Sequence, residues 1–232
     1  MIDPAAFPIA TKWPATDPSI LQLYSFPTPN GVKASIMLEE IGLPYEAHKV
    51  TLSDADVKSP EFLSLNPNNK IPAIIDPNGP DGAPIGLFES GAILIYLAEK
   101  SDKFLSGDPK KRIETIQWLM WQMGGFGPML GQAHYFLHFN KGVSEHAENR
   151  FKIECQRLYD VLDEQLEDNE FVAGEISIAD FAIFPWAARH EWQQIDLSEY
   201  ENVLRWYKTM AARSGVQAGV LVTDAEYVLP TP

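Results

Sequence analysis

The fold is decided by the stretch LYSFPTPNGVKASIMLEE, residues 23–40, where an apolar run gives way to a helical pattern. The apolar run has the length of a strand, and residues 31–41 repeat apolar side chains at the spacing of one helical face. Between the two patterns stand two prolines together with Thr28, Asn30 and Gly31. This junction contains no cysteine, histidine or carboxylate that could itself act as a nucleophile or base. The sequence therefore predicts a restrained strand-to-helix bend, and any nucleophile or base that acts at this bend must come from outside it.

The residues after this bend continue to alternate between strand-like and helix-like segments. The first two strands are joined through a helix, which favours parallel pairing with a right-handed crossover. The last two are joined by a short turn rich in Asn-Gly and Asp-Gly, which requires antiparallel pairing. We therefore expect the order β-α-β-α-β-β-α and a mixed four-stranded sheet with helices on its faces. The expected strands are 20–26, 44–52, 71–76 and 84–88, and the expected helices are 31–41, 59–67 and 89–100.

Strand signals are absent from the pattern of the second half, which predicts an all-α domain. The longest helix, residues 145–167, is amphipathic and places its only cysteine on the apolar side. The expected division is an N-terminal arm over 1–18, an α/β thioredoxin-like domain over 19–103, a linker over 104–110 and an all-α domain over 111–232. The arm contains four prolines, and the sequence leaves open whether it packs on the body or is disordered.

Composition limits the possible functions. The 232 residues include 18 basic and 32 acidic side chains, a net charge of −14, and no basic cluster. Such a chain repels phosphate backbones and anionic lipid, so we expect neither a nucleic acid nor a membrane partner. The N-terminus lacks the pattern of a signal peptide, and a single cysteine, Cys155, excludes an intrachain disulfide. A cytoplasmic location is expected, and no metal site is expected from the pair His134 and His138, for which aromatic packing is the better interpretation.

Three further motifs contain polar groups at the ends of predicted elements. In NPNNKIPAI, residues 66–74, Pro72 begins a strand, and we hypothesise that the Ile71-Pro72 bond is cis. In FESGAIL, Glu89 and Ser90 begin a helix, where free N–H groups and the helix dipole favour a carboxylate. The third motif, Ser177 to Asp180, fits a structural capping box. Taken singly each could be an ordinary turn or helix start, but the bend at residues 26–31 and the first two of these motifs should converge at one sheet edge.

These motifs resemble those of the cytosolic glutathione transferases over nearly the whole chain. The stretches PTPNGVKASIMLEE, PEFLSLNPNNKIPAI, LFESGAILIYLAEK and QWLMWQMGGFGPMLGQAHYF are most similar to the bacterial Nu class and to the related yeast nitrogen-regulatory protein. The resemblance implies the glutathione transferase fold, with glutathione as cosubstrate and no metal. It also implies a homodimer that acts on a small disulfide or electrophile.

The resemblance further implies a glutathione site. Glu89 and Ser90 would hold the γ-glutamyl end, the backbone of Ile71 would pair with the cysteinyl moiety in strand fashion, and Thr28 with Asn30 would face the sulfur. The other residues that the resemblance places at the site are Pro72, Lys70, whose side chain could equally be only solvated, and Gln132, which would reach the site from the helical domain or across a dimer.

Two positions depart from the Nu pattern, because Val57 stands where a glutamine is expected and Gln165 where a basic residue is expected. Both departures concern residues that assist carboxylate ends, so they bear on the affinity and number of glutathiones bound. Tyr24 and Ser25 are alternative thiol activators, since other classes use a tyrosine or serine near this bend. Strand alternation favours a packed core position for Tyr24.

The implied chemistry explains a bend without an acid or base. The nucleophile would arrive with glutathione, whose thiol has a pKa near ~8.5 when free. A hydroxyl, an amide and a helix dipole can stabilise the thiolate. We expect glutathione-dependent disulfide reduction, possible peroxide reduction, and conjugation to electrophiles as a lesser activity. Two alternatives stay open: a non-catalytic binding or regulatory module on the same fold, and a glutathione-dependent isomerase or lyase.

Overall fold

The computed structural model describes residues 3 and 5–232, and the chain forms two compact units. The first unit contains the residues up to Ser101 together with Ser214–Tyr227, and the second contains Asp102–Arg213 and Val228–Pro232. Contacts thus group 214–227 with the α/β unit, whereas the sequence analysis placed this segment in a helical domain over 111–232. They also group the expected linker 104–110 with the helical unit.

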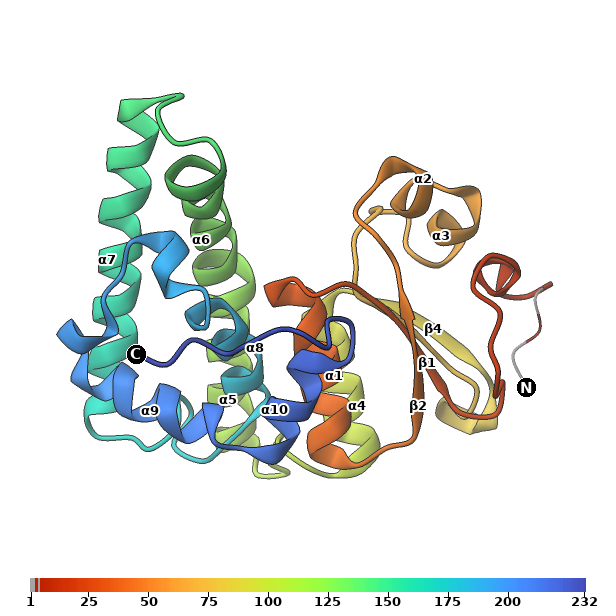
Figure 1. Ribbon diagram of the computed structural model, residues 1–232. Coiled ribbons are helices and arrows are strands. Elements are labelled where there is room, and N and C mark those ends of the chain that lie inside the picture. The colour runs from red at the N-terminus through yellow and green to blue at the C-terminus, as the bar shows by residue number, and fades with distance from the viewer. Residues whose placement is uncertain (1–2, 4) are drawn as a thin grey trace. The chain divides into compact units, whose positions relative to one another are not determined.

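The first unit contains the expected mixed sheet of four strands, in the order β2-β1-β3-β4 (Figure 1). β1 pairs in parallel with β2 and antiparallel with β3, and β3 pairs antiparallel with β4. The predicted β-α-β-α-β-β-α order is confirmed, with a short additional helix, α2, before α3. The elements are β1 (Leu21–Ser25), α1 (Pro29–Ile41), β2 (Tyr45–Lys49), α2 (Asp54–Val57), α3 (Pro60–Leu65), β3 (Ala73–Asp76), β4 (Ile85–Phe88) and α4 (Ser90–Ser101), joined by α10 (Ser214–Leu221).

Helices α1, α4 and α10 pack together in this unit. The approach of α10 to α1 is close, because a Cβ built at Gly219 would lie 2.4 Å from the Cα of Ile36. In addition, the Ser35 hydroxyl donates to the carbonyl of Gly219 at 2.6 Å. These contacts explain why α10 groups with the α/β unit although it follows the helical segment in sequence.

The N-terminal arm packs on the face of the sheet that carries Tyr24. Pro8–Thr11 form a 3₁₀ turn, Ile9 is fully buried, and Trp13 makes edge contacts with the rings of Tyr24 and Phe62 at 6.4 and 6.2 Å. The arm therefore extends the hydrophobic core, which resolves the alternative left open by the sequence. Residues 1, 2 and 4 of the expected arm lie outside the described residues.

The second unit is helical, as predicted. The helix α5 does not break at the glycine-rich segment but passes through a π-helical turn, Gln122–Phe126, into α6, and a second π-helical segment spans His134–Phe139. The apolar stripe predicted on α7 is confirmed, with Cys155 fully buried. The α-helices of this unit are α5 (Pro109–Trp121), α6 (Gly127–Ala133), α7 (Glu145–Glu167), α8 (Ile178–Ala187) and α9 (Glu201–Ala211).

The start of α8 is the predicted capping box. The Ser177 hydroxyl accepts from the backbone of Ala179 at 3.3 Å, and a carboxylate oxygen of Asp180 accepts from the Ser177 backbone at 2.9 Å. The other oxygen of Asp180 accepts from Trp206 Nε1 at 2.9 Å and from the Val172 backbone at 3.0 Å. Asp180 is fully buried, so this motif joins three parts of the helical unit.

Candidate functional site

Three strand ends meet at one edge of the sheet. In the register of the ladder, Tyr24 of β1 pairs with Ala73 of β3, and Ala73 pairs with Phe88 of β4. Because β3 is antiparallel to both neighbours, its first residue lies beside the last residues of β1 and β4. The bend after β1, the segment before β3 and the first turn of α4 therefore converge at this edge, as the sequence analysis expected.

The bend after β1 is tight and ends in an N-cap. The Thr28 backbone donates to the carbonyl of Phe26 at 2.7 Å, and the Thr28 hydroxyl oxygen accepts from the backbone N–H of Gly31 at 3.1 Å. A hydroxyl that accepts in this way keeps its own proton for donation. Thr28 and Asn30 are both half-buried. The first turn of α1 thus presents a hydroxyl and an amide beside the helix's positive end.

Gly31 is required by close packing at this bend. A Cβ at this position would lie 2.0 Å from the carbonyl oxygen of Phe26 and 2.7 Å from the hydroxyl of Ser25. The carbonyl belongs to the backbone of the bend and cannot move without displacing it. Glycine therefore allows α1 to begin directly beside the end of β1.

The segment before β3 is held by a buried asparagine. Asn66 is 2% exposed, its side-chain amide donates to the carbonyl of Lys70, and its Oδ1 accepts from the backbone of Asn68 at 2.9 Å. The Ile71-Pro72 bond is cis, which confirms the hypothesis from sequence. The Lys70 side chain is exposed. The loop places Ile71 just before the ladder, at the edge where β1 ends.

The first turn of α4 combines an exposed carboxylate with a buried hydroxyl. Glu89 is exposed and has a positive φ of 70°, whereas Ser90 is only 4% exposed. The first turn of a helix favours anions because its N–H groups and dipole point outward. A ligand that carries a carboxylate and an amine fits this pair of residues.

Sequence reasoning missed Lys33, a fully buried lysine on α1. Its Nζ lies 3.5 Å from the Ser90 hydroxyl oxygen. Burial lowers the pKa of Lys33 to about 7, although the nearby charge of Glu89 acts in the opposite direction. The sequence did contain an indication of this burial. Lys33 lies three residues before Ile36 and four before Met37, which places it on the apolar face of the predicted helix.

The two alternative thiol activators are both buried. Tyr24 is 0% exposed, stacks on the ring of His48 at a centroid distance of 4.8 Å, and has a pKa raised by burial. The predicted core position of Tyr24 is confirmed. Ser25 is 1% exposed and lies against Gly31. Among the described residues, neither hydroxyl has a hydrogen-bond partner.

The remaining expected site residue, Gln132, lies on α6 in the helical unit and is exposed. Its part in the site stays a prediction. The two departures from the Nu pattern have structural explanations. Val57 is 7% exposed and packs in the core cluster with the arm, and Gln165 donates to the carbonyl of Val172 at 2.8 Å.

The histidine pair and the cysteine of the helical unit pack as the sequence analysis expected. His134 stacks on Trp186 at 5.4 Å, lies 3.0 Å from Gln193 Nε2, and has a pKa lowered to about 4, mainly by burial. Burial raises the pKa of the Cys155 thiol to about 12. Within residues 3 and 5–232, no group of three or more potential ligands is arranged to hold a metal ion.

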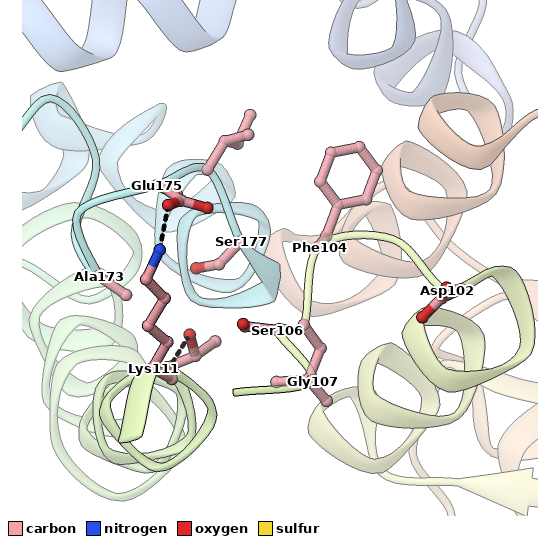
Figure 2. Close-up of a pocket in the computed structure, with 11 residues that line it drawn as sticks. Asp102, Phe104, Ser106, Gly107, Lys111, Ala173, Glu175 and Ser177 are labelled. Carbon is pink, nitrogen blue, oxygen red and sulfur yellow. Dashed lines mark hydrogen bonds and ion pairs between the residues drawn. The ribbon is translucent and has the colours of Figure 1, made fainter. Parts of the chain in front are cut away.

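The helical unit contains a cavity of about 210 Å³, shown in Figure 2. Lys111 and Glu175 form an ion pair at this cavity, and the lining hydroxyl of Ser177 donates to Asp180 at 3.1 Å. These polar side chains are thus engaged with one another or with the capping box. None of the helices in the described part of the chain has the length and hydropathy of a membrane span.

Comparison with known proteins identifies the family. The model of the glutathione S-transferase N-terminal domain matches residues 19–99, and the model of the C-terminal domain matches residues 128–214. The chain belongs to the glutathione S-transferase family. The resemblance to the bacterial Nu class, and the fold that it implied, are confirmed.

Three relatives illustrate the breadth of this similarity. Disulfide-bond oxidoreductase YfcG of Escherichia coli K12 is 47% identical over 204 residues, which are 87% of this chain and 95% of the relative. A glutathione transferase of Pseudomonas putida, crystallised with one glutathione disulfide per subunit, is 53% identical, with a TM-score of 0.90 over 94% of this chain and 98% of the other. Ure2p in complex with S-hexylglutathione is 30% identical, with a TM-score of 0.81 over 87% of this chain and 98% of the Ure2p chain.

Proposed function

We propose that this glutathione transferase uses glutathione to reduce disulfides. The observation that carries the proposal is the convergence of a hydroxyl donor at the start of α1, a strand entrance at Ile71 and an anion-favouring helix start at Ser90. This edge supplies groups for the sulfur, the backbone and the carboxylate of one tripeptide. The similarity to YfcG and to the enzyme with glutathione disulfide bound supports the same activity.

The binding roles follow from the chemistry of each group. Ser90 and its first-turn N–H groups would bind the γ-glutamyl carboxylate, and exposed Glu89 would bind the amine. The backbone of Ile71, directed by Pro72, would hydrogen-bond the cysteinyl moiety as an added strand does. Lys70 would attract the glycyl carboxylate from solvent. Gln132 is proposed as a further contact from the helical unit.

Thiol activation requires only donors and a dipole. Lowering a thiol pKa by about two units stabilises the thiolate over the thiol by about 2.7 kcal/mol. The Thr28 hydroxyl can donate to the sulfur because its oxygen is oriented by the N–H of Gly31. Asn30 adds an amide donor, and the helix dipole of α1 favours the negative charge.

The reaction proceeds by thiol–disulfide exchange. The bound thiolate attacks one sulfur of the substrate disulfide, forms a mixed disulfide with glutathione, and releases the other sulfur as a thiolate that takes a proton. The thiolate of a second glutathione then attacks the glutathionyl sulfur, which releases the second substrate thiol and leaves glutathione disulfide. Conjugation is the lesser activity, in which the same thiolate attacks an electrophilic carbon. A peroxide would be reduced by the same pair of glutathiones.

A homodimer in the cytoplasm is part of the proposal. Ile113 and Met120, seven residues apart on α5, are 63% and 49% exposed and lie on one side of the helix. Exposed apolar side chains grouped in this way favour a protein interface. Sedimentation of the wild type and of Met120→Glu tests the assembly, with dimer expected for the first and a shift toward monomer for the second.

One experiment separates the enzyme from a binding module. Calorimetry with glutathione is combined with turnover of a small disulfide and of a chlorinated aromatic. Binding with faster turnover of the disulfide supports the proposal. Binding without turnover would favour a regulatory module on this fold, and the absence of binding at millimolar glutathione would contradict both.

A further inference from the structure

The N-terminal arm precedes residue 19, where the match to the glutathione S-transferase N-terminal domain begins. The arm nevertheless shares a hydrophobic cluster with the candidate site. Ile9 of the arm and Ile71, the proposed backbone contact of the cysteinyl moiety, both belong to this cluster and are 0% and 9% exposed. The packing of the arm is therefore continuous with the packing that holds Ile71.

A lysine of the arm is attached to the helix α2. The Nζ of Lys12 donates to the carbonyl of Ala55 and lies 3.0 Å from a carboxylate oxygen of Asp56. The side chains of Lys12 and Asp56 are 30% and 21% exposed, so this attachment is partly shielded from water. A helix of one turn is too short to be stable by itself, so the position of α2 depends on such tertiary contacts.

Asp56 in turn organises the segment between β2 and α3. Its other carboxylate oxygen accepts from the backbone N–H of Thr51 at 2.9 Å and from the Thr51 hydroxyl at 2.6 Å. Its carbonyl accepts from the hydroxyl of Ser59 at 2.8 Å, and Ser59 is the N-cap of α3. Lys12 therefore holds a residue that is bonded both to the entry of α2 and to the start of α3.

The helix α3 leads directly to the loop that presents Ile71. Phe62 of α3 is fully buried in the shared cluster, and Trp13 of the arm makes an edge contact with its ring. The 3₁₀ turn of the arm also lies beside α3 (Figure 1). The helix ends at Asn66, whose amide holds the carbonyl of Lys70. A series of contacts thus runs from the arm through α3 to Ile71.

We infer that Lys12 is a positioning residue for glutathione, which holds α2 and α3 so that the backbone of Ile71 can pair with the cysteinyl moiety. The inference rests on the proposed function, because it takes the ligand at this sheet edge to be glutathione. Val57 supports it, since this residue replaces the glutamine of the Nu pattern and packs in the cluster that contains Ile9. Polar and apolar contacts thus both attach α2 to the arm.

Thermodynamic reciprocity gives the decisive readout. If a docked arm favours the conformation that binds glutathione, bound glutathione favours the docked arm by the same factor. Amide hydrogen exchange in the 3₁₀ turn reports docking, because the N–H of Trp13 donates to the carbonyl of Ile9 at 3.0 Å. Saturating S-methylglutathione should slow exchange in the wild-type arm at least about threefold more than in α9 of the helical unit.

Two outcomes of this measurement would overturn the inference. The first is unchanged exchange in the arm of a protein that calorimetry shows to bind the ligand. The second is slowing of equal size in the arm and in α9, because it would reflect stabilisation of the whole fold by the ligand. Failure of the wild type to bind either glutathione or its S-methyl form would instead contradict the proposed function, so the two failures are distinguishable.

Variants separate positioning from general stability. Lys12→Met removes the ammonium but keeps a side chain of similar length, and it should raise the glutathione KM about threefold with kcat nearly unchanged. Lys12→Arg should restore the KM, because a guanidinium can donate to the same carbonyl and carboxylate. Lys58→Met is the matched control, because Lys58 pairs with Asp54 of the same helix at 2.8 Å and lies outside the arm. Equal rises in KM for Lys12→Met and Lys58→Met would overturn the inference, as would a change confined to kcat.

A double-mutant cycle tests the route through Asp56. Lys12→Met and Asp56→Asn should each weaken S-methylglutathione binding, and the loss in the double variant should be smaller than the sum of the two single losses. Losses that add fully would overturn this route.

Discussion

Two helix starts in this protein use the same cap and differ in what surrounds it. At α1 the Thr28 hydroxyl accepts from the Gly31 N–H at 3.1 Å, and at α8 the Ser177 hydroxyl accepts from the Ala179 N–H at 3.3 Å. At α8 the hydroxyl proton is used internally, since Ser177 donates to the buried carboxylate of Asp180 at 3.1 Å. At α1 the capping residue is half-buried and no carboxylate belongs to the cap.

The difference indicates how to distinguish a structural helix start from a binding one. When a helix start accounts for its own donors and acceptors and is buried, as at α8, its polar groups stabilise the fold. When the capping side chain remains partly exposed and donates to no carboxylate of the cap, as at α1, the same chemistry can serve a ligand anion. Four measurements test this distinction.

The largest effect is expected at α8. Asp180→Ala removes a buried carboxylate that accepts from Trp206, Val172 and Ser177, and leaves buried donors without an acceptor. We expect a loss of about 4 kcal/mol in the free energy of unfolding, measured with denaturant. Asp196→Ala is the control, because Asp196 is exposed and caps a short turn by accepting from the Ser198 backbone at 2.9 Å, and about 1 kcal/mol is expected there. Equal losses would contradict the structural role given to Asp180.

The second effect is the pH dependence that Lys33 gives to stability. Its pKa is about 7 in the folded state and 10.5 in the reference state, so between these values the unfolded chain binds more protons. The free energy of unfolding therefore rises with pH between about 7 and 10.5, and the gain from this difference in pKa is absent below pH 7. From pH 7 to 9 the wild type should gain about 2 kcal/mol relative to Lys33→Met. A difference independent of pH would show that Lys33 has an ordinary pKa.

Sequence predicted most of the first unit because local patterns and the fold agree there. The alternating strand and helix segments and the turn between β3 and β4 follow from local signals, whereas the cis bond at Pro72 was a hypothesis from the fold context. The helix α2 was missed because a single turn, Asp54–Val57, is too short to give a helical period. The grouping of α10 with α1 depends on a close packing at Gly219 that only the folded chain reveals.

The candidate site was predictable to the extent that its groups lie at element ends. Thr28, Asn30 and Ser90 stand at helix starts, where residue type already indicates polar groups beside the unpaired backbone N–H groups of the first turn. Lys33 was missed because a charged residue on a predicted helix is ordinarily assigned to the solvent face. Its burial depends on the packing of α1 against α4, a contact between segments far apart in the sequence.

The third effect is at Asn30, on the binding side of the comparison. Asn30→Ala removes an amide donor beside the proposed thiolate and should lower kcat/KM for disulfide reduction at least about tenfold, roughly 1.4 kcal/mol. The free energy of unfolding should change little. Asn78→Ala is the control, because exposed Asn78 donates to the carbonyl of Ser19 away from this edge. An unchanged rate for Asn30→Ala would move thiol activation to Thr28.

The fourth and smallest effect is the loss of stability expected at Thr28, and it tests the comparison directly. Thr28→Val keeps the shape of the side chain but removes both the cap acceptor and the donor to sulfur. We expect a loss of about 1 kcal/mol in the free energy of unfolding together with a lower turnover, while Thr28→Ser restores both. Ser177→Ala should cause a similar loss of stability with kcat/KM unchanged in the folded protein. If Thr28→Val lowered the free energy of unfolding and left kcat/KM unchanged, as is expected for Ser177→Ala, the start of α1 would be structural in the same sense as the start of α8. Its hydroxyl would then serve the helix and not the ligand.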